Sequence, residues 1–168
     1  MKLKIVTYNI HKGFNWRNSK LTIELLHPAL KELDPDIIFL QEVVGENKIL
    51  EKKMDKWISD QVQYLAQDIW PNSAYSRHAV FDHRDHGNVI LSKFPIKRSK
   101  VYKLSQNALE KRALLFCELE INSKIMHCYC THLNLLHRDR MKQYQKIQEI
   151  LLKDSASKIP TILAGDFN

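Results

Sequence analysis

Two segments of the chain are almost entirely apolar and end in polar side chains. They are residues 36–43, DIIFLQEV, and residues 160–167, PTILAGDF. Short apolar runs of this kind are typical of strands that lie in the middle of a sheet covered on both faces. The chain must therefore build a sheet and cover both of its faces.

Hydrophobic spacing predicts the remaining elements. Apolar residues recur every three or four positions in three segments, which predicts helices over residues 21–33, 57–69 and 138–152. Segments rich in β-branched and aromatic residues predict further strands over residues 3–10, 73–81, 88–96, 112–121 and 124–134. Polar turns without helices separate the last four of these strands, so we expect them to pair antiparallel.

These elements predict an α/β fold with one mixed, mostly antiparallel sheet and helices on its outer face. The length of 168 residues is ordinary for one domain, and no repeat, low-complexity tract or linker interrupts it. The predicted helices are too few to cover both faces of that sheet. One apolar face is therefore expected to be left for further chain, for a second copy or for another protein.

The net charge favours a polyanionic partner without establishing one. Lys and Arg number 26 against 19 Asp and Glu, which gives a formal charge of +7. A basic surface attracts nucleic acid or acidic lipid headgroups. The cations form no dense block, however, so a solvated surface explains the same excess.

Cysteine usage and the N-terminus predict a reduced, cytoplasmic protein. The three cysteines, Cys117, Cys128 and Cys130, are odd in number and are not spaced as a disulfide framework. The first residues, MKLKIVTYNIH, contain no long apolar region of a signal peptide. No apolar stretch approaches the roughly 20 residues that a transmembrane helix needs.

Four predicted strands end in residues that can bind metals or accept hydrogen bonds. The pairs are Asn9 and His11, Gln41 and Glu42, His132 and Asn134, and Asp166 and Asn168. Rigid strands direct the side chains at their ends into a common crevice. Carboxylates and carboxamides are hard oxygen ligands that suit Mg²⁺ or Mn²⁺, and no nucleophilic Ser or Cys stands out. A metal, an aspartate that orients water and a histidine that meets an anionic oxygen fit phosphoester hydrolysis.

Two other metal sites are weaker interpretations. Cys128, Cys130 and His132 share one face of a strand, but the first and third lie about 13 Å apart, too far for one zinc ion. The two cysteines are better explained as buried packing. The segment RHAVFDHRDHGN, residues 77–88, is rich in His and Asp and predicts either a metal-binding loop or a solvated loop rim.

The chain resembles the endonuclease/exonuclease/phosphatase superfamily. The motifs TYNIH, LQEV, GNVILSKFPI, THLN and GDFN occur in the order found there, and the resemblance extends from Lys4 to Asn168. This superfamily includes pancreatic-type deoxyribonuclease, abasic-site endonucleases, neutral sphingomyelinases and inositol-phosphate phosphatases. The resemblance implies a phosphate-containing substrate: a nucleic acid, a phospholipid or an inositol phosphate.

The resemblance also implies roles for individual residues. Glu42 matches the glutamate that binds the divalent metal, and Asn9 matches the asparagine that supports metal and phosphate. His132 matches the histidine that contacts the scissile phosphate. Asp166 matches the aspartate that orients the attacking water, and Asn168 matches an asparagine that hydrogen-bonds the phosphate in the transition state.

Four further residues are candidates for substrate binding. Arg112 lies where several members of the superfamily place a phosphate-contacting arginine. Loops between strands line the substrate groove in this superfamily, which makes Arg77 and His78 candidates for contact with a phosphate or headgroup. His11 follows the first strand and is the fourth candidate.

The chain departs from the superfamily pattern after GDFN, where members carry a second half. That half supplies a second sheet, a further aspartate near the metal and the histidine that acts as general base. Residues 1–168 are therefore expected to be the N-terminal portion of one domain, half of a four-layer α/β sandwich.

Such a portion is expected to be inactive or weakly active. The alternative is a truncated, non-catalytic protein that binds a partner, or a second copy of itself, through the uncovered sheet face.

Overall fold

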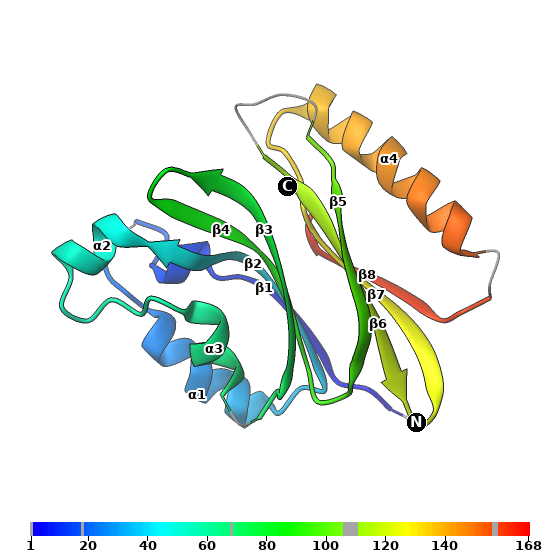
Figure 1. Ribbon diagram of the computed structural model, residues 1–168, viewed down its shortest axis with the longest axis horizontal. Coiled ribbons are helices and arrows are strands. Elements are labelled where there is room, and N and C mark those ends of the chain that lie inside the picture. The colour runs from blue at the N-terminus through cyan, green and yellow to red at the C-terminus, as the bar shows by residue number, and fades with distance from the viewer. Residues whose placement is uncertain (1, 18, 68, 106–110, 156–157) are drawn as a thin grey trace.

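The computed structural model describes residues 2–17, 19–67, 69–105, 111–155 and 158–168. Eight strands form two four-stranded sheets that pack face to face, and helices lie outside both sheets (Figure 1). The first sheet has the order β1-β2-β4-β3 and the second the order β5-β6-β7-β8. The predicted α/β class is confirmed, whereas the expectation of a single sheet is wrong.

The first sheet is built from β1 (Ile5–Asn9), β2 (Ile37–Asn47), β3 (Asn72–Phe81) and β4 (Arg84–Ser92). The second is built from β5 (Ile96–Lys103), β6 (Ala113–Ile121), β7 (Lys124–His132) and β8 (Thr161–Asp166). The helices are α1 (Ile23–Leu33), α2 (Lys48–Lys53), α3 (Gln61–Ala66) and α4 (His137–Ser155), with a 3₁₀ turn, η1, at His11–Gly13. β1 pairs parallel with β2, and β8 parallel with β7, while the other pairs are antiparallel.

The second sheet arises because β4 and β5 do not pair with each other. β4 pairs with β2 and β3, and the turn after Ser92 carries the chain across to the other layer. A strand that the sequence does not predict, β5, then begins the second sheet. Its residues, IKRSKVYK, are basic and mostly exposed because it is an edge strand, so it lacks the apolar alternation of a buried strand.

The face that we expected to be uncovered is instead covered by the same chain. Ile37, Phe39 and Ile90 of the first sheet pack against residues of the second, among them Leu115, Cys117, Leu119, Cys128 and Cys130. The predicted packing role of Cys128 and Cys130 is confirmed, since both are fully buried. Burial raises the pKa of each of these two thiols to about 12, which keeps them protonated.

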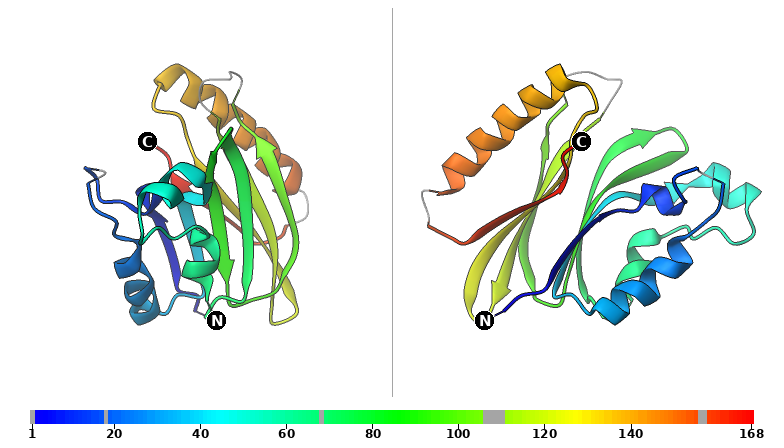
Figure 2. Two further views of the ribbon diagram at one scale, coloured as in Figure 1. Left: turned by 60° about the vertical axis from the view of Figure 1, so that its left-hand side comes forward. Right: turned by 180° about the vertical axis from the view of Figure 1, so that it is seen from behind.

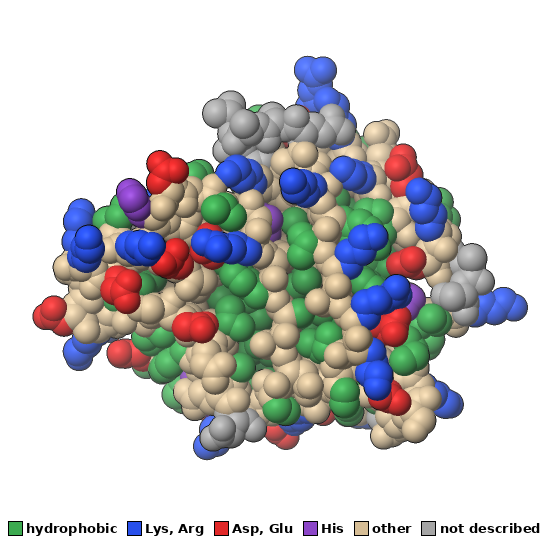
Figure 3. Space-filling model, viewed as in Figure 1, with side chains coloured by type: hydrophobic (Ala, Val, Ile, Leu, Met, Phe, Trp, Pro, Cys, Tyr) green, Lys and Arg blue, Asp and Glu red, His purple; other side chains and the backbone are tan. Residues whose placement is uncertain are grey.

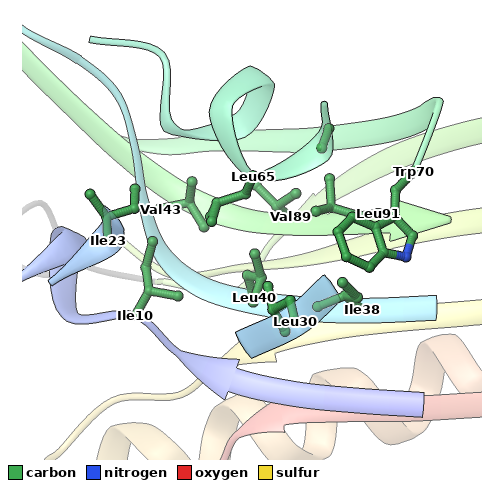
Figure 4. Packing of buried hydrophobic residues seen from close by; sticks show 11 residues of the cluster. Ile10, Ile23, Leu30, Ile38, Leu40, Val43, Leu65, Trp70, Val89 and Leu91 are labelled. Carbon is green, nitrogen blue, oxygen red and sulfur yellow. The ribbon is translucent and has the colours of Figure 1, made fainter. Parts of the chain in front are cut away.

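Helices cover the outer faces. α1 and α3 pack on the first sheet, where Leu30, Leu65 and Trp70 form a cluster with Ile38 and Leu91 (Figure 4). On the other side α4 lies along the second sheet (Figure 2), and its Ile147 joins a cluster with Leu114, Phe116 and Tyr129. Among the residues described, no helix is both long and apolar enough to cross a membrane.

α1 and α4 begin and end near their predicted limits, whereas α2 was not predicted from the sequence. The helix predicted over residues 57–69 is only the short α3, because the side chain of Asp60 caps it by accepting a hydrogen bond from the Gln63 amide. Trp57 nevertheless stays in contact with the fold by stacking on Phe14, with ring centroids 5.9 Å apart.

The pairing directions bring one end of every strand to the same rim of the sandwich. β1, β2, β3, β5, β7 and β8 end at this rim, and β4 and β6 begin there. The rim is uppermost in Figure 1, next to the label of the C-terminus. The polar ends of the strands therefore meet at one place.

The packing between the sheets predicts a large effect for a central truncation. We expect Phe39→Ala to lower the free energy of unfolding by about 3–5 kcal/mol, because it opens a cavity where Phe39 is fully buried. Leu25→Ala is the control, since Leu25 on α1 is 66% exposed, and its cost is expected to stay within about 0.5 kcal/mol. Urea unfolding followed by circular dichroism measures both. Equal losses would contradict this account of the core.

Candidate functional site

Four side chains from four strands meet at the rim, two from each sheet. Asn9 Nδ2 donates a hydrogen bond to Asp166 Oδ2 at 2.9 Å and so joins β1 to β8 across the two sheets. His132 lies between two carboxylates, with Nε2 3.7 Å from Asp166 Oδ2 and Nδ1 3.8 Å from Glu42 Oε1. The structure therefore brings together both residues predicted as metal ligands and two of the three predicted as catalytic, His132 and Asp166.

An irregularity in β2 aims Glu42 at this centre. The register of β2 against β4 shifts between Leu40 and Val43, and Glu42 has a φ of +57°. A bulge inserts an extra residue and turns a side chain away from the regular alternation, and bulges are frequent beside active sites. The left-handed backbone is uncommon for a residue other than glycine. The left-handed backbone at Glu42 is thus a local strain that directs its carboxylate into the site.

The Glu42 carboxylate is surrounded by cationic and hydrogen-bonding groups. Lys12 Nζ lies 2.9 Å from Oε2, and His11 Nδ1 lies 3.8 Å from the same oxygen. Burial raises the pKa of Glu42, but the hydrogen bond and charge of Lys12, with smaller effects from His132 and Asn9, outweigh it and lower the pKa. Glu42 is therefore an ionised, largely buried carboxylate whose other oxygen, Oε1, faces His132.

A buried glutamine, Gln61, joins the segment that carries Lys12 to the strand that carries Glu42. Gln61 Nε2 donates to the Lys12 carbonyl at 3.0 Å, and Gln61 Oε1 accepts from the Val44 amide at 3.0 Å. Gln61 is fully buried at the start of α3. Gly13, with φ +83°, gives it space, because a Cβ there would lie 2.7 Å from Gln61 Nε2. Gln61 is thus a positioning residue that ties η1 to β2.

Asp166 is held as a carboxylate by its neighbours. Its Oδ1 accepts from the Asn168 amide at 3.0 Å, and Oδ2 accepts from Asn9. Burial raises the pKa of Asp166, but these two hydrogen bonds and the charges of His132 and Arg112 outweigh it and lower the pKa.

The residues on either side of Asp166 fix the end of β8. Asn168 Nδ2 donates to the Leu133 carbonyl at 2.6 Å, so its amide fastens the end of β8 to the residue after β7. Gly165 is needed for the close approach of these two strands, because a Cβ there would lie 2.0 Å from the Thr131 carbonyl oxygen.

The donor set suits a hard cation better than zinc. Within the described part of the chain, no three His, Cys, Asp or Glu side chains are grouped to hold a metal by themselves. Mg²⁺ does not need such a group, because it takes one or two carboxylates and keeps several waters. Glu42 and Asp166, two carboxylates within 4 Å of His132 and both with lowered pKa values, are the residues that could hold such a cation.

The comparison with known proteins agrees with the motifs. Residues 6–168 match the Endonuclease/Exonuclease/phosphatase family. The chain belongs to this family. It is 33% identical to the uncharacterized protein YbhP of Escherichia coli strain K12, over 98% of this chain and 66% of that protein. The chain thus spans slightly under two thirds of this relative.

Solved structures of the family share the fold. An endonuclease/exonuclease/phosphatase from Beutenbergia cavernae aligns with a TM-score of 0.80 and 21% identity, over 99% of this chain and 47% of that one. A Bacteroides thetaiotaomicron mannosyl-6-phosphatase aligns with a TM-score of 0.72, 18% identity and coverage of 99% and 66%. The human Nocturnin catalytic domain with bound sulfate aligns with a TM-score of 0.72 and 19% identity, over 99% of this chain and 64% of that one. The predicted family and fold are confirmed.

Two of the predicted substrate residues, His78 and Arg112, lie close to His132 and Asp166. The charges of Arg112 and His132 act on His78, and Arg112 also acts on Asp166. His78 Nδ1 lies 2.9 Å from Ser76 Oγ, and its ring centroid lies 6.5 Å from that of His86.

The other two predicted substrate residues have different environments. His11 faces Glu42, as described above. Arg77 is bound instead to a buried carboxylate, with Nε 2.8 Å from Asp85 Oδ2, and lies farther along the rim.

Sequence reasoning missed three residues of the site. Lys12 directly follows the motif TYNIH, next to His11, so its position beside the motif was a signal for it. His86 lies on β4, in a segment interpreted as a loop, and its pKa is lowered to about 4, first by burial and then by the charge of Lys12. Gln61 lies within the predicted helix over residues 57–69, where one polar residue among others gives no signal of a role in the site.

The role of Gln61 predicts a specific response to an isosteric change. Gln61→Glu keeps an oxygen for the Val44 amide but turns the donor to Lys12 into a second acceptor. We expect a loss of about 1–3 kcal/mol in unfolding free energy and weaker Mn²⁺ binding, measured by titration under electron paramagnetic resonance. Gln63→Glu, on the exposed side of α3, is the matched control. Unchanged Mn²⁺ affinity in Gln61→Glu would contradict a positioning role.

Two partly buried histidines, His78 and His86, make the fold sensitive to acid. Burial is the main cause that lowers the pKa of His78 and of His86 to about 4. The unfolded chain therefore binds more protons than the native one between about pH 6.5 and pH 4. Stability is full above pH 6.5 and is expected to fall as the pH drops through this range.

The replacement His86→Phe tests this pH dependence. It removes one titrating group and should reduce the slope of unfolding free energy against pH by up to about 1.4 kcal/mol per pH unit. Urea unfolding between pH 7.5 and 4.5 measures the slope. Identical slopes in the two proteins would show that His86 titrates normally.

Proposed function

We propose that the protein is a divalent-metal-dependent phosphoesterase that hydrolyses a phosphodiester or phosphomonoester by in-line attack of water. The observation that carries the proposal is the convergence of Asn9, Glu42, His132 and Asp166 from both sheets at one rim. Family membership supports a hydrolase of phosphoesters. The identity of the metal, the activity and the substrate are parts of the proposal.

In this proposal Glu42, supported by Asn9, would hold Mg²⁺ or Mn²⁺. The metal, when bound, neutralises negative charge that develops on the phosphoryl oxygens. Lys12 already supplies positive charge to the same carboxylate. Metal binding at Oε1, the oxygen that faces His132, would leave the Lys12 contact at Oε2 in place.

The remaining groups position phosphate and water. Asp166 is ionised and fixed on both oxygens, which suits a residue that accepts a hydrogen bond from the attacking water and so orients it. His132 lies beside it, with its side chain almost buried, and would donate to a phosphoryl oxygen. Arg112 would add positive charge beside the phosphate. The Asn168 side chain would hydrogen-bond the phosphate after releasing the Leu133 carbonyl. The family resemblance implies a further histidine as general base, which stays a prediction.

The substrate is proposed only as a class. Nucleic acids, phospholipids and inositol phosphates all stay candidates from the family resemblance. A mannosyl-6-phosphatase and a Nocturnin domain with a bound sulfate share the fold. At under 25% identity they show the fold alone, so the chemistry rests on the residues of this chain. The prediction that residues 1–168 are the N-terminal portion of a longer domain also stays a prediction.

The alternative of a non-catalytic protein that binds a partner through an uncovered sheet face is not supported by the packing of the sheets. It required an uncovered sheet face, and the inner faces of the two sheets cover each other. Both outer faces carry helices. Self-association through such a face therefore has no support from the described fold.

Removal of the Glu42 charge tests the proposal. We expect Glu42→Gln to lower turnover of bis(p-nitrophenyl) phosphate with Mg²⁺ or Mn²⁺ by about 10²–10³-fold in the full-length protein, as for loss of a transition-state stabiliser. Mn²⁺ affinity, measured by electron paramagnetic resonance, should fall with it. Glu46→Gln is the control, because Glu46 lies on the same strand but pairs with Lys48 and Arg77. Turnover that survives both EDTA and Glu42→Gln would refute the proposal.

A further inference from the structure

A cavity lies on the same rim, at the ends of β3 and β5. Its volume is about 400 Å³, and its lining includes four cationic side chains from both sheets, Arg77, Lys103, Lys111 and Arg112. The described residues that line it include no carboxylate. His78 also lines it and is neutral at pH 7, because burial lowers its pKa to about 4. Arg77 is already paired with the carboxylates of Asp85 and Glu46, so the positive charge that favours an anion in the cavity comes from Lys103, Lys111 and Arg112.

The cationic side chains are partly fixed before any ligand arrives. Arg77 is held by the buried Asp85, with Nε 2.8 Å from Oδ2. Lys111 Nζ donates to the Val80 carbonyl at 2.5 Å and lies 5.3 Å from the centre of the Phe81 ring. Lys103 ends β5 and is exposed. Figure 3 shows Lys and Arg side chains in a row across the upper part of this face.

The strand order sets the distance from this cavity to the candidate metal site. β3 is two places from β2 in the first sheet, and β5 is two places from β7 in the second. Neighbouring strands lie about 4.8 Å apart, so the two sites are separated by roughly 10 Å along the rim. Arg112 connects them, because it lines the cavity and its charge also acts on Asp166.

We propose that this cavity is a second phosphate subsite, which binds another phosphate of a phosphodiester chain whose scissile phosphate lies at Glu42 and His132. This inference rests on the proposed function. Successive phosphates of one strand advance about 3.4 Å along the helix axis, so a phosphodiester chain of a few nucleotides is long enough to extend over the roughly 10 Å between the two sites. A single-stranded nucleic acid laid along the rim would reach both sites, with Arg112 between them.

The subsite can be tested without turnover. The full-length protein is titrated with a 5′-fluorescein oligothymidylate of eight nucleotides in EDTA, and anisotropy is read at salt concentrations from 50 to 200 mM. Loss of two phosphate contacts in K103A/K111A should weaken binding and reduce the slope of log K against log[salt] by about 1.4. Lys100→Ala is the matched control, because Lys100 is on the same strand but packs over Tyr102, with Nζ 4.6 Å from the ring centre.

Three outcomes decide the matter. A reduced slope in K103A/K111A with an unchanged slope in K100A supports the subsite. Equal losses in both variants show a diffuse basic surface and overturn it, and an unchanged slope in K103A/K111A overturns it as well. Failure of the phosphoesterase proposal would appear separately, in the metal-dependent turnover assay of Glu42→Gln.

Discussion

The packing of one sheet on the other is the constraint on which the site depends. Asn9 and Asp166 are 157 residues apart in sequence, and Glu42 and His132 come from different sheets. These pairs meet only because Phe39 and its neighbours hold the two inner faces together. Face-to-face sheets lie about 10 Å apart, so side chains at a shared rim can span the gap from both sides. The core between the sheets is thus also the support of the candidate site.

The electrostatics of the site reflect a balance around two carboxylates. Burial opposes ionisation of both Glu42 and Asp166, and in each case nearby donors and cations reverse the effect. Lys12 is the main partner of Glu42, whereas Asp166 depends mostly on hydrogen bonds from Asn9 and Asn168. One carboxylate is therefore stabilised by a cation and the other by amides. This difference fits the two roles proposed for these residues, metal binding for Glu42 and water orientation for Asp166.

Much of this arrangement was predictable from sequence, and the failures have physical causes. The apolar strands ending at Glu42 and Asp166 were visible because burial on both faces leaves a continuous apolar run. The second sheet was not, since strand partners depend on contacts far apart in sequence, and the basic edge strand β5 has no buried face that would produce a pattern. The role of Gln61 was not predictable for a similar reason. Its side chain joins the Lys12 carbonyl to the Val44 amide by hydrogen bonds, and both groups are distant from it in sequence.

The rim can also be understood as a gradient of charge along the strand order. Its β1–β8 side carries the two carboxylates, and its β3–β5 side carries Arg77, Lys103 and Lys111. Between them lie His78, His86 and Arg112, and the two histidines are neutral at pH 7 because burial lowers their pKa values. A cation is thus favoured at one end and an anion at the other. A bound metal would reverse the sign at the carboxylate end, and the whole rim would then attract phosphate. Under the proposed function, binding of the metal would therefore raise the affinity of the rim for a polyanion.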